Sequence, residues 1–175
     1  MERNRVAMLA VLRQFRVLVR SMREHYRGVE ETSGLGGAQV WALAEVVASP
    51  GLSTGDLARR LGVHLSTASN LVSRLDGLGL VRRERAGRDL RVVQIVATPS
   101  GRKKLTSAPR PLVGVLQQAL LDLPRRRLEA LQAELSEVMR HIKLRDARAA
   151  RSTPIAEMLS RRRARSTKEK RRLKG

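Results

Sequence analysis

A change of hydrophobic period at Gly79 constrains the fold of this chain more than any other feature. Before Gly79, apolar residues recur every three or four positions, which is the spacing of amphipathic helices. After it, residues 81–85 and 91–97 form short β-like segments, and residues 86–89, Ala-Gly-Arg-Asp, have the composition of a turn. The sequence therefore predicts a mainly α chain with a small β-hairpin.

Two short helices are predicted directly before this hairpin. Ser53 and Asp56 have the spacing of a capping box, which marks the start of a helix. Gly62 suits the left-handed residue that ends that helix, and a second helix is predicted over residues 65–78. Two helices joined at a glycine turn and followed by a basic hairpin form a winged helix-turn-helix, whose second helix enters the major groove of DNA.

The outward face of the second helix is polar in a way that favours DNA. At about 100° per residue, its apolar side chains occupy one side and leave hydroxyls and an amide on the other. Hydroxyls let the backbone approach phosphates, and Asn can pair with adenine. The alternative is an exposed polar face with no partner. The DNA contacts predicted here are His64, Ser66, Thr67, Ser69, Asn70, Ser73 and Arg74.

The hairpin carries several arginine residues, which suit the narrow, electronegative minor groove. A generic basic surface is the alternative, because the whole chain is basic. Asp89 would repel phosphate unless paired, so we expect it to hold a neighbouring arginine and to set the shape of the wing. The wing residues predicted to act in DNA binding are Arg83, Arg85, Arg88, Asp89 and Arg91. His64 is expected to cap its helix or to touch phosphate, with a pH switch as the alternative.

The charge of the chain favours a polyanionic partner. It has 36 Lys or Arg residues against 16 Asp or Glu, a net charge of +20, which points to double-stranded DNA before an anionic membrane. Residues 145–175 hold 12 of the basic residues and three acidic ones. Such like-charge blocks are expected to be disordered and to act as an electrostatic arm, an inert solubilising tail being the alternative.

Several classes of protein are excluded by what the sequence lacks. The chain has no cysteine and three histidines, so we expect neither a thiolate site nor a metal, and no cofactor. It has no phosphate-binding Gly-Lys-Ser/Thr loop and no catalytic His-Glu-x-x-His motif, so we expect no enzyme. Its apolar runs are far below the ~18 residues of a membrane span. We expect a cytoplasmic, nucleoid-associated protein with no membrane contact.

Helices are also predicted on both sides of the winged helix. Residues 5–27, 98–121 and 124–143 have helical periodicity, and Pro109 and Pro111 should break the middle one. The last helix carries a stripe of Leu128, Leu131, Leu135, Val138 and Ile142. This stripe exceeds what one small winged domain needs, so we expect a dimer. The predicted domains are residues 1–34 and 101–144 for dimerisation, 35–100 for DNA binding and 145–175 as the tail.

The sequence resembles the MarR family of bacterial transcriptional regulators. The resemblance rests on residues 52–63, on Ser66 and Thr67 with the helix through Leu75, and on residues 79–83. It continues through Asp89-x-Arg91 in the wing and residues 98–101, Thr-Pro-Ser-Gly. It runs without a gap over about residues 35–105 and more loosely over 6–143. The tail is an addition to this pattern.

The resemblance implies a homodimer that binds a palindromic operator, with Arg91 at the minor groove and Asp89 in support. It also implies a small, often anionic aromatic effector in a cleft between the dimerisation and DNA-binding regions. Tyr26 and Trp41 are the candidate cleft residues, together with Phe15, but core or interface packing is favoured over this role. The leading hypothesis is a ligand-responsive repressor. The alternative is an architectural, nucleoid-associated protein that binds DNA with little regard to sequence.

Overall fold

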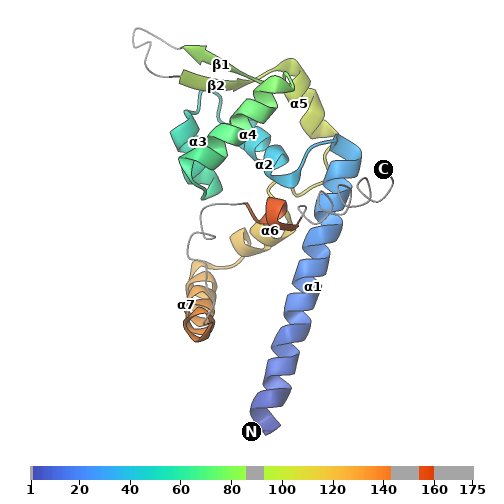
Figure 1. The fold of residues 1–175 in the computed structure, drawn as a ribbon, viewed down its shortest axis with the longest axis vertical. Coiled ribbons are helices and arrows are strands. Elements are labelled where there is room, and N and C mark those ends of the chain that lie inside the picture. The colour runs from blue at the N-terminus through green and yellow to red at the C-terminus, as the bar shows by residue number, and fades with distance from the viewer. Residues whose placement is uncertain (1, 86–92, 143–153, 160–175) are drawn as a thin grey trace, which may run out of the picture.

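The computed structural model describes residues 2–85, 93–142 and 154–159. These residues form helices and one two-stranded sheet (Figure 1). In chain order the elements are α1 (Glu2–Ser33), α2 (Gly37–Ala48), α3 (Thr54–Leu61), α4 (Leu65–Gly77), β1 (Val81–Arg85), β2 (Val93–Ala97), α5 (Pro99–Thr106), α6 (Val115–Leu121) and α7 (Arg125–His141). The predicted fold class, mainly α with a β-hairpin wing, is confirmed.

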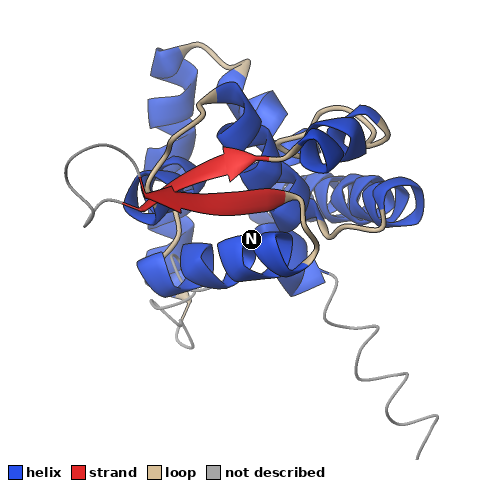
Figure 2. Ribbon diagram, turned by 90° about the horizontal axis from the view of Figure 1, so that it is seen from above, coloured by secondary structure: helices blue, strands red, loops and turns tan. Residues whose placement is uncertain are grey.

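The hydrophobic core lies where α2, α3, α4 and the hairpin meet. The periodic apolar side chains of α3 and α4 face inward as their spacing predicts, and those of Ala68, Leu71, Val72 and Leu75 on α4 are at most 1% exposed. The largest fully buried side chains are Leu43, Leu57, Leu71, Leu75, Ile95, Val29, Val40, Val46, Val72 and Val81. Figure 2 shows the hairpin lying across the helices from above. We call α2 to α5 with the hairpin the winged-helix body.

The hairpin is antiparallel, and β2 is hydrogen-bonded to the segment before α3. Val81 pairs with Ala97 and Arg85 with Val93. The Ile95 backbone N–H also donates to the Leu52 carbonyl at 2.9 Å, which ties β2 to the segment before α3. Beyond β2, the Thr98 hydroxyl accepts from the Gly101 N–H at 3.0 Å and caps α5, with Pro99 as the first helical residue.

The second part of the molecule, α1, α6 and α7, we call the helical arm. Helix α1 is longer than predicted, because it continues through Gly28 and ends only at Gly34, which has a φ of 66°. Burial of Tyr26 and Val29 on either side of Gly28 outweighs the cost of about 1 kcal/mol for a helical glycine. The expected break at Pro109 and Pro111 is present, but helix resumes only at Val115 in α6.

The helical arm leaves large apolar side chains exposed. On α7 the predicted stripe lies in solvent, with Leu128, Leu131 and Leu135 each between 36% and 42% exposed. On the N-terminal half of α1, the exposed apolar residues are Val6, Met8, Leu9, Val11, Leu12, Phe15, Val17 and Leu18. Figure 1 shows this half of α1 extending away from the winged-helix body.

Residues 154–159 differ from the expectation of a disordered tail. They form a helical turn in which the Pro154 carbonyl accepts from the N–H groups of Glu157 at 3.0 Å and Met158 at 3.2 Å. Ala156 is buried in the core. Leu159 packs against the same core, so the turn covers part of its surface. The remaining tail residues lie outside the described part of the chain.

Candidate nucleic-acid interface

The helix-turn-helix is positioned by its capping residues. The Ser53 hydroxyl accepts from the Asp56 N–H at 3.1 Å, and the Asp56 carboxylate accepts from the Ser53 N–H at 3.2 Å. The Ser53 hydroxyl also donates to the Asp56 carboxylate at 2.6 Å, and this bond, followed by the one from the Ser53 N–H, is the main reason that the pKa of Asp56 lies below its ordinary value. At the other end of α3, Gly62 is left-handed with a φ of 64°. Both features match the prediction, and they set where α3 begins and ends.

The predicted recognition face of α4 lies on the surface. Ser66, Asn70, Ser73 and Arg74 are exposed, whereas Thr67 and Ser69 are partly covered. His64 stands at the N-cap position of α4 and is exposed, but its side chain makes no capping hydrogen bond. The expectation that His64 caps the helix through its side chain is therefore wrong. An imidazole has a fixed ring that reaches the N2 and N3 amides less readily than a short hydroxyl or carboxylate does.

The wing and the recognition helix are joined by Arg83. This side chain extends from β1 over α4, where its Nη2 donates to the Ser73 hydroxyl at 2.8 Å. Its Nε also lies 3.9 Å from an Asp76 carboxylate oxygen. Arg83 thus fixes β1 against α4 and places basic and hydroxyl groups on one continuous surface.

Arg85 ends β1 as an exposed cation. The other predicted wing residues, Arg88, Asp89 and Arg91, lie outside the described residues.

Arg74 has a neighbour that the sequence did not indicate. Its Nη1 lies 3.5 Å from the Glu157 carboxylate of the turn 154–159. This contact spans 83 positions in the chain, so no local pattern could have predicted it. The only available signal was a cluster of Ile155, Ala156, Met158 and Leu159 around one acidic residue within an arginine-rich tail.

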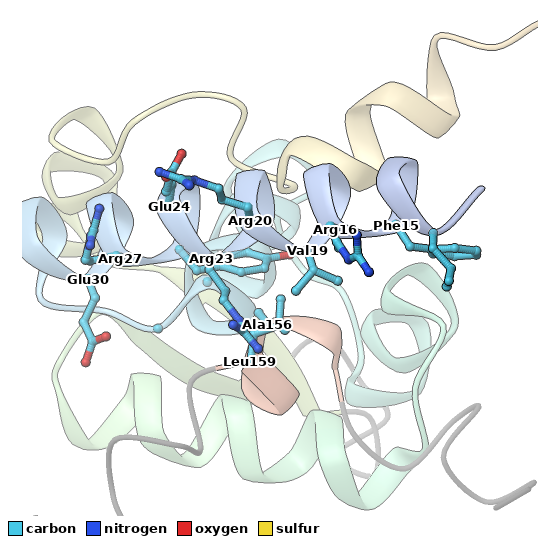
Figure 3. A pocket seen from close by; sticks show the side chains of 14 residues that line it. Phe15, Arg16, Val19, Arg20, Arg23, Glu24, Arg27, Glu30, Ala156 and Leu159 are labelled. Carbon is cyan, nitrogen blue, oxygen red and sulfur yellow. The ribbon is translucent and has the colours of Figure 1, made fainter. Parts of the chain in front are cut away.

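A cavity of about 770 Å³ lies beside α1 where the arm meets the body. Its floor includes Tyr26, Val19 and Leu159, and Figure 3 shows Arg16 and Arg23 among the arginines around it. The Tyr26 hydroxyl accepts from the Gln117 amide nitrogen at 3.2 Å, and burial raises the pKa of Tyr26. The cavity combines an apolar floor with guanidinium groups and two carboxylates, Glu24 and Glu30, of which Glu24 pairs with Arg20 at 2.9 Å. Arg16 and Arg23 are the guanidinium groups that could bind an anion with an apolar body.

Trp41 does not line this cavity with Tyr26. It borders a separate cavity of about 180 Å³ with Leu61, Val63 and Ile155, and its indole N–H donates to Glu45 at 3.2 Å. The sequence placed both aromatic residues at one cleft, and the structure puts them at two. The turn 154–159 contributes residues to both cavities.

Comparison with known proteins identifies the helix-turn-helix segment. Residues 33–91 match the model of the MarR family. This segment, about a third of the chain, is similar to that family. The matched residues include α2, α3, α4 and β1, which form the polar surface described above.

Solved structures share the MarR fold. Staphylococcus aureus MepR in a MepR–DNA complex has 23% identity and a TM-score of 0.52, over 73% of this chain and 92% of MepR. A probable transcriptional regulator from Pseudomonas aeruginosa has 26% identity and a TM-score of 0.50, over 73% of this chain and 93% of its own. No curated protein matches the chain in sequence. Within the described residues, no helix has the length and hydropathy needed to cross a membrane.

Proposed function

We propose that this chain, which is similar to the MarR family over residues 33–91, is a sequence-specific repressor that binds palindromic operators as a homodimer and responds to a small ligand. The observation that carries the proposal is the continuous surface of α4 and β1. There, Ser66, Asn70 and Arg74 are exposed beside the Arg83–Ser73 hydrogen bond. Asn70 would read bases in the major groove, and Arg74 would bind phosphate. MepR, which has the same fold, is known in complex with DNA.

The homodimer is supported by the apolar residues of the helical arm. Residues 1–34 and 101–144 would form the dimerisation region, with the α7 stripe and the N-terminal half of α1 covered by the second chain. Contiguous exposed apolar patches of this kind mark protein interfaces. Each protomer would then present one α4 to one half-site, with the half-sites about 10 bp apart, centre to centre.

Selection from random double-stranded DNA at physiological salt tests sequence specificity. We expect a palindrome with that spacing. No enrichment would instead favour the architectural alternative, which the basic tail supports.

Two substitutions distinguish recognition of DNA bases from binding of DNA phosphates. Asn70→Ala should change the selected bases, and Arg74→Ala should weaken binding to all sequences. Arg126→Ala is the matched control, because it removes the same charge from an exposed site on α7. Equal effects of Arg74→Ala and Arg126→Ala would mean that total charge, and not this surface, governs binding.

The ligand response is supported by the cavity beside α1. Its arginines and apolar floor suit an aromatic carboxylate, for which benzoate is a simple probe. Titration calorimetry should detect benzoate binding at millimolar concentration, and Arg23→Gln should weaken it. Benzoate should also lower the affinity for the selected operator. Absence of binding, or binding that Arg23→Gln does not alter, would contradict this site.

A further inference from the structure

Residues 154–159 lie between the two parts of the molecule. Ala156 is 6% exposed and belongs to the same core as Tyr26 of α1. Leu159 lines the cavity beside α1, and Pro154 and Ile155 line the cavity that contains Trp41. Figure 3 shows Ala156 and Leu159 beneath α1, next to the labelled Arg23. The turn therefore touches both the helical arm and the winged-helix body.

The surface that receives the turn depends on Gly37. A Cβ at this position would lie 2.4 Å from the Tyr26 ring and 3.1 Å from the Ala156 Cβ. The first distance is a clash, and the second is closer than ordinary contact. Because Gly37 has no side chain, the start of α2 approaches both residues at once. The turn thus packs against a complementary surface around Gly37 and Tyr26, which we call the seat, and not merely against an exposed apolar surface.

The turn also brings a carboxylate to the recognition helix. Glu157 lies 3.5 Å from Arg74, and its side chain is only 26% exposed. Glu157 is one of three acidic residues in the whole of segment 145–175. A phosphate group bound through Nη1 of Arg74 would compete with this carboxylate, because both attract the same N–H donors.

We propose that residues 154–159 form a C-terminal latch that occupies Arg74 and restrains the recognition helix until DNA displaces it. This inference rests on the proposed DNA contact of Arg74. The seat is shallow, since Ile155 is 42% and Met158 53% exposed, so the latch can be released without unfolding the core. Arginine blocks follow the latch directly at residues 161–163. Attraction of these blocks to DNA would pull the latch from its seat while phosphate takes its place at Arg74.

Trp41 provides a direct measurement of the latch. It is the single tryptophan of the chain and borders Pro154 and Ile155. Ala156→Gln is too large for the seat and leaves the net charge unchanged, so it should release the latch. In the full-length protein we expect greater quenching of Trp41 by acrylamide and operator binding that is roughly three- to tenfold tighter. Operator DNA should increase the quenching of the unsubstituted protein and add little in Ala156→Gln.

Glu157→Gln tests the competition for Arg74 without altering the seat. Its matched control is Glu169→Gln, which makes the same change of charge in the same tail. Glu157→Gln should bind the operator about threefold more tightly than the control, as expected for loss of an exposed ion pair. Because this substitution is polar and partly exposed, it carries the test even if Ala156→Gln does not fold.

The outcomes separate the latch from the proposed function. If Arg74→Ala weakens DNA binding but Glu157→Gln equals Glu169→Gln, the latch is wrong and the DNA contact stands. If Arg74→Ala leaves the affinity for DNA unchanged, the proposed role of α4 in DNA binding is wrong, and the latch, which rests on that role, is wrong with it. Quenching of Trp41 that operator DNA does not change would also overturn the latch.

Discussion

Helices α4 and α7 are both amphipathic, yet their apolar faces have different surroundings. On α4, Ala68, Leu71, Val72 and Leu75 are all at most 1% exposed, because α2, α3 and the hairpin cover them. On α7, Leu128, Leu131, Leu135 and Val138 are between 36% and 52% exposed. The hydrophobic pattern predicts an apolar face in each case. It does not say whether the covering surface comes from the same chain or from another one.

This difference assigns stability and assembly to separate parts of the molecule. The winged-helix body should fold by its own packing, whatever the protein concentration. The helical arm should depend on a second chain for burial of its apolar residues, so its stability should rise with concentration. The following predictions address this division, from the largest expected effect to the smallest.

Leu71→Ala should have the largest effect on folding. The side chain is 1% exposed at the centre of the body, and truncation of such a leucine costs about 2–5 kcal/mol in the free energy of unfolding. Urea denaturation at two protein concentrations measures this cost, which should be the same at both. A cost that grows on dilution would mean that the body itself depends on the dimer.

The double substitution Leu131→Glu and Leu135→Glu should separate the protomers. It places two carboxylates in the apolar stripe of α7, and their burial in a dimer would weaken association by about 100-fold or more. Sedimentation should show a folded monomer at micromolar concentration. Leu65→Glu is the control, since Leu65 is 59% exposed on α4 outside this stripe. A dimer that persists in the double variant would place the interface elsewhere.

Ser53→Ala should have a smaller effect, confined to the body. Loss of the cap on α3 costs about 1 kcal/mol of unfolding free energy. His64→Ala is the comparison at the next helix, where no side-chain cap exists, and surface changes of this kind stay within about 0.5 kcal/mol. Thermal unfolding of both variants provides the measurement. Equal losses would contradict the capping difference between α3 and α4.

His25 should give a modest pH dependence at the junction of arm and body. Burial is the main cause that lowers its pKa, against an opposing hydrogen bond to the Pro111 backbone. Below about pH 6.5 the unfolded chain therefore binds a proton more readily than the folded chain, and stability falls as the pH is lowered. Denaturation of wild type and His25→Gln between pH 5 and 8 should show a weaker fall in the variant. Parallel curves would exclude this contribution.

The predictable parts of the fold are those with local causes. Ser53, Gly62, Gly79 and the Thr98–Pro99 pair marked helix boundaries correctly, because caps and left-handed turns involve residues a few positions apart. The length of α1 was underestimated, because Gly28 weakens a helix locally while the burial of Val29 depends on distant segments.

The candidate site was predictable only in part, for the same reason. The outward polar face of α4 follows from helical geometry, and the structure places it at the surface. The Arg74–Glu157 contact and the division of Tyr26 and Trp41 between two cavities depend on where the turn 154–159 packs. Charge dominates that stretch of sequence, and the seat beside Gly37 is visible only in three dimensions.

The length of α1 gives the molecule a mechanical lever. Its 32 residues span about 48 Å. The C-terminal third, with Met22, Tyr26 and Val29, is embedded in the body, whereas the first half projects from it. A tilt of only about 5° about the embedded end would thus displace the projecting end by about 4 Å, given a helix of that length. The cavity beside α1 lies along this lever. A small molecule bound in the cavity therefore acts at a point where a small tilt of the helix becomes a larger displacement.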